Sequence, residues 1–489
     1  MIDSVLLIRP WGIGKKEFPV GLLYVGTALE KSGYKVKIID LQDDPSAENK
    51  IIDILSNSEN TMLGISALSL HYRWLKNFTL RLKEASPKTK ILVCGHISVI
   101  HNILLKKTGT DFVCLGEGEE LFPELIEKIN RSGSLDDILG LAYKVNENII
   151  KTGRRQFLKN FLIPNYDLVD VNRYVIHPSQ DKFFQRSAEY GSHQRPDDKL
   201  GVIMFSRGCV GACTFCYRHL PGFRQESVEW SWNHLLLLRE KYGIKYFRID
   251  DELFTNNPVW LDNFCEKLKD LKGDILFRVG GLRVDLINGE QLKSLKEVGC
   301  IGINYGIESG SQKILDKMNK RTTVAQNLFT LKQTLDHGIQ TMAYMMLGYE
   351  GEDKKTLSET LSLILDAGLS PESVSPAYTI ALPGTRIYDN CLKSGKIKNE
   401  EEYLENCAPY IEQEKESYER YILNLSDVSI ITLRRWEKLL PIFIKLNKKL
   451  KNQPKLFKMI RSIIFFIPAN PVIMWLERRI WKSLSFLRI

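Results

Sequence analysis

The chain has few cysteines, no long uncharged hydrophobic run and no secretory leader pattern. Nine cysteines among 489 residues are too few and too scattered for the disulfide framework of a secreted scaffold. The apolar run near the start is strand-sized, ends at Arg9 and has no basic segment before it, which is not typical of a signal peptide. No stretch of roughly 18 uncharged apolar residues predicts a membrane span. We therefore expect a cytoplasmic protein with reduced thiols.

Positive charge is scarce outside the C-terminal end. The formal net charge is +9, from 68 basic and 59 acidic residues. Residues 431–489 carry 14 Lys and Arg against 2 Glu, a net +12 that leaves −3 for the first 430 residues. The basic pI of about 8.9 thus reflects a tail, and we expect no nucleic-acid partner. With 44% hydrophobic and 26% charged residues, the chain is expected to fold as two or three globular domains.

Short apolar runs alternate with segments of helical spacing over residues 1–135. Strands are expected at 4–9, 34–40, 62–68, 90–95 and 111–116, and helices at 21–33, 74–85, near 104 and at 119–129. Val, Ile and Leu runs separated by helices predict a doubly wound, Rossmann-like α/β domain whose parallel sheet is covered on both faces. Its ligand is expected outside the carboxyl ends of the strands.

The rest of the chain divides into three parts by the same reasoning. Residues 136–195 are mostly polar and predict a linker with a small hairpin. Between 196 and 390, six strands beginning near 201, 246, 276, 302, 340 and 373, with helices between them, predict a partial (β/α)6 barrel or a full barrel. Residues 391–489 are expected to be helical and basic.

The strongest local signal is Ser206-RGCVGACTFCYR, just after a predicted strand. Cys209, Cys213 and Cys216 have the spacing CxxxCxxC, which lets a tight loop aim three thiolates at one point, as an iron–sulfur cluster needs. Gly208 and Gly211 allow the backbone to wrap closely around such a cluster. Three buried cysteines or a zinc site are the alternatives, but zinc usually takes four ligands in CxxC pairs and no second pair occurs.

The cysteine motif resembles that of the radical S-adenosylmethionine (SAM) enzymes, and the resemblance covers roughly residues 200–385. It implies a 4Fe–4S cluster on Cys209, Cys213 and Cys216, with SAM chelated by the open iron and cleaved to a 5′-deoxyadenosyl radical. Motifs at Arg248-IDDELF, Gly306-IESGS and Met346-LGYEGE belong to the same resemblance. It also implies that five residues contact SAM, at the adenine or elsewhere on the molecule: Phe215, Tyr217, Glu308, Ser309 and Gly348.

Charged residues near the expected strand ends have two interpretations. Asp250, Asp251 and Glu252 either face the cluster side of the barrel or are solvated capping acids. If residues 276–282 form a strand, Arg278 and Arg283 face different directions, so at most one points into the barrel. An arginine there could neutralise the carboxylate of SAM.

The N-terminal pattern resembles the cobalamin-binding (B12-binding) domain of cobalamin-dependent radical SAM enzymes, including methyltransferases and the anaerobic Mg-protoporphyrin cyclases. The segments that carry the resemblance are Gly21-LLYVGTALEKSGYKVKIID, Gly64-ISAL, Val93-CGH and Asp111-FVCLGEGEE. Ligands of such domains bind beyond the carboxyl ends of the strands, so the cobalamin ring is expected against the loops that follow them. These loops hold Ser66, Ala67, Leu68, Gly95, His96, Gly116, Glu117 and Gly118. A Rossmann-like scaffold without cobalamin is the alternative.

The DxHxxG motif that supplies a histidine to cobalt in many cobalamin proteins is absent. The domain's histidines are His71, His96 and His101, and none has that context. His96 lies on an expected cofactor loop, either as a ligand or ring contact or as an ordinary polar residue. Six other cysteines lie singly, so buried thiols are expected and a second three-thiolate cluster in the N-terminal domain is excluded.

The tail from Lys445 mixes basic residues with Phe, Ile, Trp and Leu, and prolines at 468 and 471 interrupt it. This composition suits either peripheral contact with an anionic membrane or a helical cap on the barrel.

The leading hypothesis is a cobalamin-dependent radical SAM methyltransferase that acts on an unactivated carbon of a small molecule or lipid. A low-potential flavodoxin or ferredoxin would be its electron donor. The alternative is radical chemistry without methyl transfer, namely cyclisation, oxidation or carbon–carbon coupling on a tetrapyrrole, lipid or natural product. A cobalamin-binding sensor with an inert cluster domain is a third hypothesis.

Overall fold

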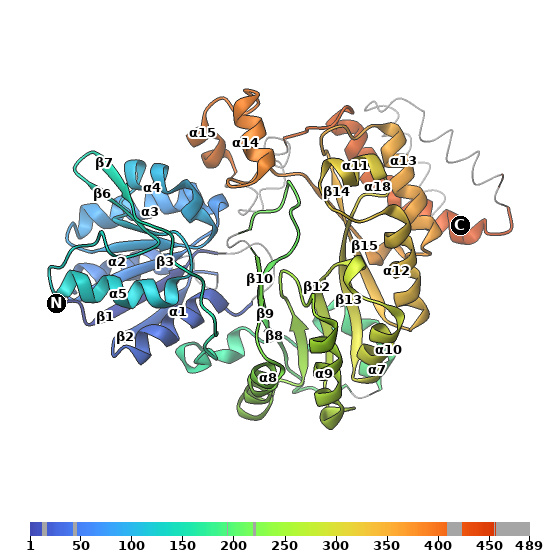
Figure 1. The fold of residues 1–489 in the computed structure, drawn as a ribbon, viewed down its shortest axis with the longest axis horizontal. Coiled ribbons are helices and arrows are strands. Elements are labelled where there is room, and N and C mark those ends of the chain that lie inside the picture. The colour runs from blue at the N-terminus through green and yellow to red at the C-terminus, as the bar shows by residue number, and fades with distance from the viewer. Residues whose placement is uncertain are drawn as a thin grey trace.

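The computed structural model describes residues 1–11, 17–42, 46–192, 194–218, 222–407, 423–453 and 455. Two α/β domains stand beside each other, with the hairpin β9–β10 between them (Figure 1). Most of the basic tail lies outside the described residues, so its two interpretations stay predictions. Among the described helices, none is both long enough and apolar enough to cross a membrane.

The N-terminal sheet has the order β2-β1-β3-β4-β5-β6-β7. Its first five strands are parallel and run over β1 (Ser4–Arg9), β2 (Lys35–Asp40), β3 (Thr61–Ser66), β4 (Ile91–Cys94) and β5 (Phe112–Cys114). The five strands and the doubly wound topology confirm the predicted fold class. The strand order reverses at β1 and β3, so a crevice forms beyond their carboxyl ends.

Helices cover both faces of this sheet because β1 is apolar on both sides. Leu6 and Ile8 pack in one core with α2 (Ala47–Ser56), α3 (Tyr72–Ala85) and α4 (His101–Lys107). Val5 and Leu7 pack in a second core with α1 (Val20–Lys31) and α5 (Gly118–Asn130). Such two-sided burial is what parallel strands require. Helix α2 was not predicted.

An antiparallel hairpin extends the sheet beyond β5. Strand β6 (Leu141–Val145) pairs with β5 and with β7 (Asn148–Lys151). The small hairpin expected within residues 136–195 therefore continues the N-terminal sheet. The domain boundaries themselves stay predictions.

The second domain is a six-stranded parallel sheet in the order β15-β14-β13-β12-β11-β8. Its strands are β8 (Leu200–Ile203), β11 (Tyr246–Ile249), β12 (Leu276–Leu282), β13 (Cys300–Glu308), β14 (Gln340–Leu347) and β15 (Val374–Tyr378). All six coincide with predicted strands. Because β8 and β15 are its two edges, the structure is a partial barrel.

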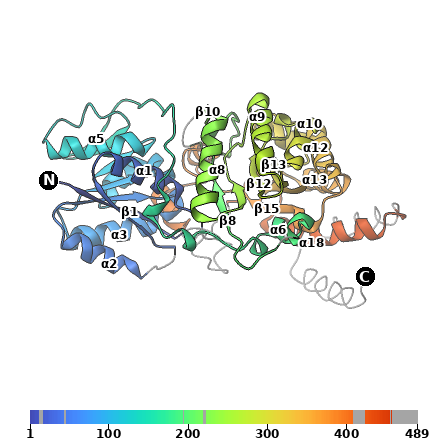
Figure 2. The same cartoon turned by 90° about the horizontal axis from the view of Figure 1, so that it is seen from below.

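Five long helices form the outer layer of the barrel (Figure 2). They are α8 (Val228–Tyr242), α9 (Pro258–Leu268), α10 (Gly289–Glu297), α12 (Val324–Asp336) and α13 (Lys354–Asp366). On the inner side, Phe183 of the short helix α6 (Lys182–Gln185) packs so closely on Gly302 that a Cβ there would lie 2.1 Å from its ring. This ring plugs the barrel at the amino ends of its strands.

The C-terminal region contacts both domains. Helices α14 (Arg386–Lys393) and α15 (Glu400–Asn406) lie above the junction in Figure 1, and α18 (Ile430–Lys449) packs on α13. Lys76 on α3 donates to Glu401 at 2.7 Å and to Glu405 at 2.8 Å. Leu404 joins the core of the N-terminal domain. This region therefore fastens the two domains together.

Candidate active site between the two domains

The three motif cysteines lie on the hairpin between β9 (Ser206–Cys209) and β10 (Gly222–Gln225), which pair antiparallel. Cys209 ends β9, and Cys213 and Cys216 follow in the connection, here called the cysteine loop. Gly211 N donates to Cys209 Sγ at 3.3 Å. A Cβ on Gly211 would lie 3.3 Å from Cys209 Sγ and 3.7 Å from Cys213 Sγ. The loop therefore brings two of the three sulfur atoms close to this glycine.

The segments behind the cysteine loop brace it through its backbone. Asn319 Nδ2 donates to Ala212 O at 2.8 Å, and Thr214 N donates to Met318 O at 3.0 Å. Among the described residues, no three His, Cys, Asp or Glu side chains converge closely enough to hold a single metal ion. The convergence on one point that the spacing suggests is therefore not seen for a single ion, but a cluster needs less of it because each thiolate binds a different iron. The braced turn with its sulfur acceptor therefore fits a polynuclear cluster better than zinc.

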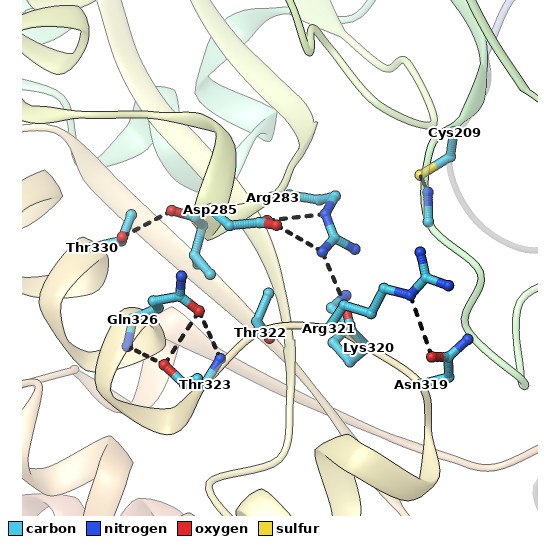
Figure 3. Close-up of polar contacts among 12 residues, drawn as sticks. Cys209, Arg283, Asp285, Asn319, Lys320, Arg321, Thr322, Thr323, Gln326 and Thr330 are labelled. Carbon is cyan, nitrogen blue, oxygen red and sulfur yellow. Dashed lines mark hydrogen bonds and ion pairs between the residues drawn. The ribbon is translucent and has the colours of Figure 1, made fainter.

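Two buried cations stand beside the cysteine loop. Arg283 forms a fork with Asp285, with both N–O distances 3.0 Å, and also donates to the carbonyl of Lys320 (Figure 3). Lys320 is 7% exposed and pairs with Glu308 at 3.0 Å. Burial raises the pKa of Cys213, and the charges of Lys320 and Arg283 lower it. The pKa of Cys213 stays above its ordinary value because burial outweighs the two cations, whose positive charge suits an anionic cofactor.

The backbone is strained next to this loop. Glu308, Asn319 and Arg321 have φ values of +64°, +51° and +59°, a region that non-glycine residues rarely adopt. Figure 3 shows Asn319 and Arg321 on the side of Cys209. Such strain costs about 1–3 kcal/mol per residue and persists where the surroundings fix it, often at functional sites.

The other residues expected to contact SAM have varied surroundings. Glu308 lies beside Lys320 and the cysteine loop. The hydroxyl of Ser309 lies 3.2 Å from that of Thr360 and accepts from Ser311 N, so it is engaged within the protein. Gly348 has φ +81° with Leu433 close by, and Phe215 packs against an apolar cluster that includes Met318. Their contacts with SAM stay predictions.

The two arginines of the β12 region do not follow a simple alternation. Arg278 pairs with the buried Asp181, with N–O distances of 3.2 and 3.1 Å. Arg283 lies beyond the end of β12, and the pairing register shifts between Val279 and Leu282. The argument that the two must face different directions therefore does not hold. Arg283 is the one that reaches the cysteine loop.

A cavity of about 330 Å³ lies between the domains. Its N-terminal wall includes five of the predicted cobalamin-contact residues, namely Ser66, Gly95, Gly116, Glu117 and Gly118. Its barrel wall includes Ser206, Arg207 and Gly208 of β9. A Cβ on Gly116 would meet no atom within 4 Å, so bare backbone borders open space there. This lining suits a flat macrocycle that comes close to the main chain.

Leu68 and His96 lie outside the residues that line this cavity. Leu68 is 44% exposed. His96 accepts from Ser69 N at 3.1 Å, and its ring meets Tyr217 edge-on at a centroid distance of 3.8 Å. Tyr217 of the cysteine loop thus touches the N-terminal domain. None of the domain's three histidines lines the cavity, and the roles of Leu68, His96 and Tyr217 stay predictions.

Glu117 and Glu119 join the cavity to the cysteine hairpin through an ion cluster that sequence reasoning missed. Arg207 on β9 lies 2.7 Å from both carboxylates, and Arg224 on β10 lies 2.9 Å from Glu117. The guanidinium of Arg207 also stacks 4.3 Å from the ring of Tyr24. These charge-assisted contacts therefore fix the position of the segment after β5 relative to the hairpin β9–β10.

The three acids after β11 have three different roles. Asp250 pairs with Arg248 at 2.5 Å, and Glu252 lines the cavity between the domains. Asp251 is buried and accepts from Phe205 N at 2.9 Å and Ser206 N at 2.8 Å. Burial raises the pKa of Asp251 to about 8, and these backbone hydrogen bonds lower it in part. Asp251 therefore supports the start of the hairpin.

Five of the six remaining cysteines are buried thiols, as predicted, whereas Cys94 is only partly buried. Cys114, Cys265, Cys300, Cys391 and Cys407 are buried, and Cys94 lines the cavity while donating to Ile65 O at 3.3 Å. Burial raises the pKa of Cys94 to about 12.

Comparison with known proteins agrees with this division of the chain. A model of the B12 binding domain matches residues 13–126, and a model of the Radical SAM superfamily matches residues 203–364. The uncharacterized methyltransferase PH0819 of Pyrococcus horikoshii is 26% identical over 79% of this chain and 81% of that protein. The anaerobic magnesium-protoporphyrin IX monomethyl ester cyclase of Synechocystis is 23% identical over 88% of this chain and 82% of that protein.

A solved structure shares the fold. The radical SAM methyltransferase TsrM of Kitasatospora setae, determined with cobalamin and a [4Fe–4S] cluster bound, aligns with a TM-score of 0.63 at 16% identity. The alignment covers 81% of this chain and 75% of that one.

These matches define a radical SAM enzyme with an N-terminal B12-binding domain. The chain combines a B12-binding domain with a domain of the Radical SAM superfamily, the combination found in the cobalamin-dependent radical SAM enzymes that its cysteine motif and N-terminal pattern resemble. Its two matched domains are those named for the expected cofactors, SAM and cobalamin.

Proposed function

We propose that the chain is a cobalamin-dependent radical SAM methyltransferase that methylates an unactivated carbon of a small-molecule or lipid substrate. The observation that carries the proposal is the cavity between the domains, which has the B12-like loops on one wall and the cysteine hairpin on the other. When bound, the cluster and SAM supply a 5′-deoxyadenosyl radical, and the cobalamin supplies the methyl group.

Residues of the chain have separate tasks in this proposal. Cys209, Cys213 and Cys216 would hold the cluster, and Arg283 and Lys320 would balance its negative charge. Bare backbone at Gly116 would receive the corrin ring, on the cavity wall that Gly95 also lines. The ion cluster around Arg207 keeps both cofactor sites at a fixed distance, because reacting groups must be held in register for productive transfer.

The inner face of the barrel offers polar groups for a substrate. Arg248 and Arg278 occupy matching positions on neighbouring strands, and Asn304 Nδ2 donates to Tyr344 OH at 3.0 Å. Arg248 Nε and Asn304 Oδ1 are buried and have no hydrogen-bond partner among the described residues. Tyr344 is 42% exposed although it lies on a central strand of the barrel. A buried donor and acceptor left open favour a substrate with a polar, hydrogen-bonding portion.

The second candidate is a radical reaction without methyl transfer. The similarity to the magnesium-protoporphyrin cyclase, which spans 88% of this chain, supports it. Both candidates need a low-potential electron donor. Location in the cytoplasm and contact with a membrane surface stay predictions in either case.

Labelled SAM separates the two candidates even before the substrate is identified. The anaerobically reconstituted chain is incubated with SAM carrying a trideuterated methyl group and with a strong reductant. The proposal expects the labelled methyl group on the extracted corrinoid and, with substrate present, on the product alongside 5′-deoxyadenosine. Formation of 5′-deoxyadenosine with no label on the corrinoid or the product would favour the second candidate.

A further inference from the structure

A second cavity, of about 780 Å³, lies behind the cysteine loop. Its wall includes Thr214, which stands between Cys213 and Cys216 in the sequence. Thr214 contacts the hydroxyl of Tyr349, and its carbonyl accepts from Ile387 N at 3.2 Å. The cavity therefore reaches the back of the loop, away from the cavity between the domains.

The segments that brace this side of the loop are strongly basic. Residues 312–321, which include α11 (Gln312–Lys317), and residues 386–398 carry only two acids, Asp316 and Asp389. They carry eight cations, namely Lys313, Lys317, Lys320, Arg321, Arg386, Lys393, Lys396 and Lys398. The first 430 residues as a whole have a net charge of −3. These two segments therefore carry a net charge of +6, although Lys320 is buried against Glu308 and Lys313 pairs with Asp353.

The cations that line the cavity are available to a partner. Lys393 and Lys396 are exposed and form no ion pair with any described residue. Lys317 lies 3.6 Å from Glu350, and Asp427 is the other acid of the lining. Exposed lysines around an open cavity suit a transient protein partner, because charges at a rim steer association more than they bind tightly.

We propose that this cavity and its lysine rim are the docking surface for an acidic one-electron carrier protein. This inference rests on the proposed function, which requires a cluster reduced from outside. In the step, the reduced carrier loses one electron and the cluster gains it, with no bond formed or broken and no proton transferred. The path is short, because Thr214 borders the cavity and is bonded directly to Cys213.

The test compares two double charge reversals in the full-length, anaerobically reconstituted chain. Lys393→Glu with Lys396→Glu reverses the rim. Lys293→Glu with Lys332→Glu is the matched control, because these lysines are exposed on the outer helices α10 and α12. The probe is an acidic flavodoxin. Its dissociation constant is measured by calorimetry in the oxidised state, and cluster bleaching is then followed with flavodoxin hydroquinone or with dithionite.

The proposal expects the rim variant to bind flavodoxin about tenfold more weakly and to be reduced by it about tenfold more slowly at low salt. Reduction by dithionite, which needs no docking surface, should match wild type, and the control variant should behave as wild type throughout. An unchanged dissociation constant, or equal slowing with dithionite, would overturn the proposal.

Two further results would bear separately on the ligand of the cavity and on the proposed function. Phosphate that binds the wild type but not the rim variant, with flavodoxin binding unchanged, would assign the cavity to a small anion and overturn the docking surface. A wild-type chain with no cluster for dithionite to bleach would contradict the proposed function, while the calorimetric comparison would still decide the docking surface.

Discussion

Replacing Asp251 by Asn should change how the stability of the barrel depends on pH. Burial raises the pKa of Asp251 from an ordinary 3.8 to about 8, so the folded protein holds a proton that the unfolded chain releases. A raised carboxyl pKa means that the free energy of unfolding falls as pH rises between these two values and levels off above the higher one.

The free energy of unfolding of wild type falls by about 1.4 kcal/mol per pH unit in the middle of this range and more slowly near pH 8, so it falls by about 2 kcal/mol from pH 6 to pH 8. Over the whole shift the fall reaches about 6 kcal/mol. Asn keeps the acceptor for the backbone N–H groups of Phe205 and Ser206 and has no such titration. Its new N–H donor replaces Oδ2, which has no hydrogen-bond partner among the described residues, at a cost of about 1–3 kcal/mol that does not vary with pH.

Urea unfolding followed by tryptophan fluorescence at several pH values provides the assay. The difference in unfolding free energy between Asp251→Asn and wild type should move in favour of the variant as pH rises, by about 2 kcal/mol from pH 6 to pH 8. Asp262→Asn, which removes an exposed carboxylate on α9, serves as the control. Parallel wild-type and Asp251→Asn curves over this range would refute the reasoning.

Three further variants test the site. Cys213→Ala should lose bound iron and cleavage of SAM while keeping its corrinoid, as measured by metal analysis and chromatography of 5′-deoxyadenosine. Gly116→Leu should fold but lose most of its corrinoid, read from the absorbance of the purified protein, because its side chain would enter the cavity. Gly191→Leu, also in open space, is the matched control. Lys320→Met should lower the free energy of unfolding by about 3–5 kcal/mol because it leaves Glu308 buried without its partner, and adding Glu308→Gln should restore most of this loss in urea titrations.

Each of these variants has an opposing result. Full iron content in Cys213→Ala would remove that cysteine from the cluster. Equal corrinoid content in Gly116→Leu and Gly191→Leu would place the corrin elsewhere. A Lys320→Met variant as stable as wild type would mean that the ion pair with Glu308 is not effectively buried.

The strands were predictable because their signal is local. Ser4–Arg9 is a run of Val, Leu and Ile, and the six barrel strands are short segments rich in aliphatic, aromatic or Met residues, which parallel sheets can bury on both faces. Helix α2 was missed because it is short and only three of its residues are buried, namely Ala47, Ile51 and Leu55.

The cysteines were predictable from their spacing alone. The charged residues that hold the surrounding segments in place were not. Arg207 lies 90 positions from Glu117, and Lys320 lies 12 positions from Glu308. Only the folded chain brings these charges together. The strand alternation used for Arg278 and Arg283 did not allow for the register shift between Val279 and Leu282, although the glycine pair Gly280 and Gly281 could have signalled it.

The central claim is that three cysteines hold a cluster while the N-terminal domain holds a corrinoid. The most direct measurement is the iron, sulfide and cobalt content of the anaerobically reconstituted chain, compared with a variant in which Cys209, Cys213 and Cys216 are all Ala. The account predicts a full 4Fe–4S complement with one corrinoid in the wild type, and corrinoid without iron in the variant. Iron retained by the triple variant, or a wild type that binds no corrinoid, would contradict it.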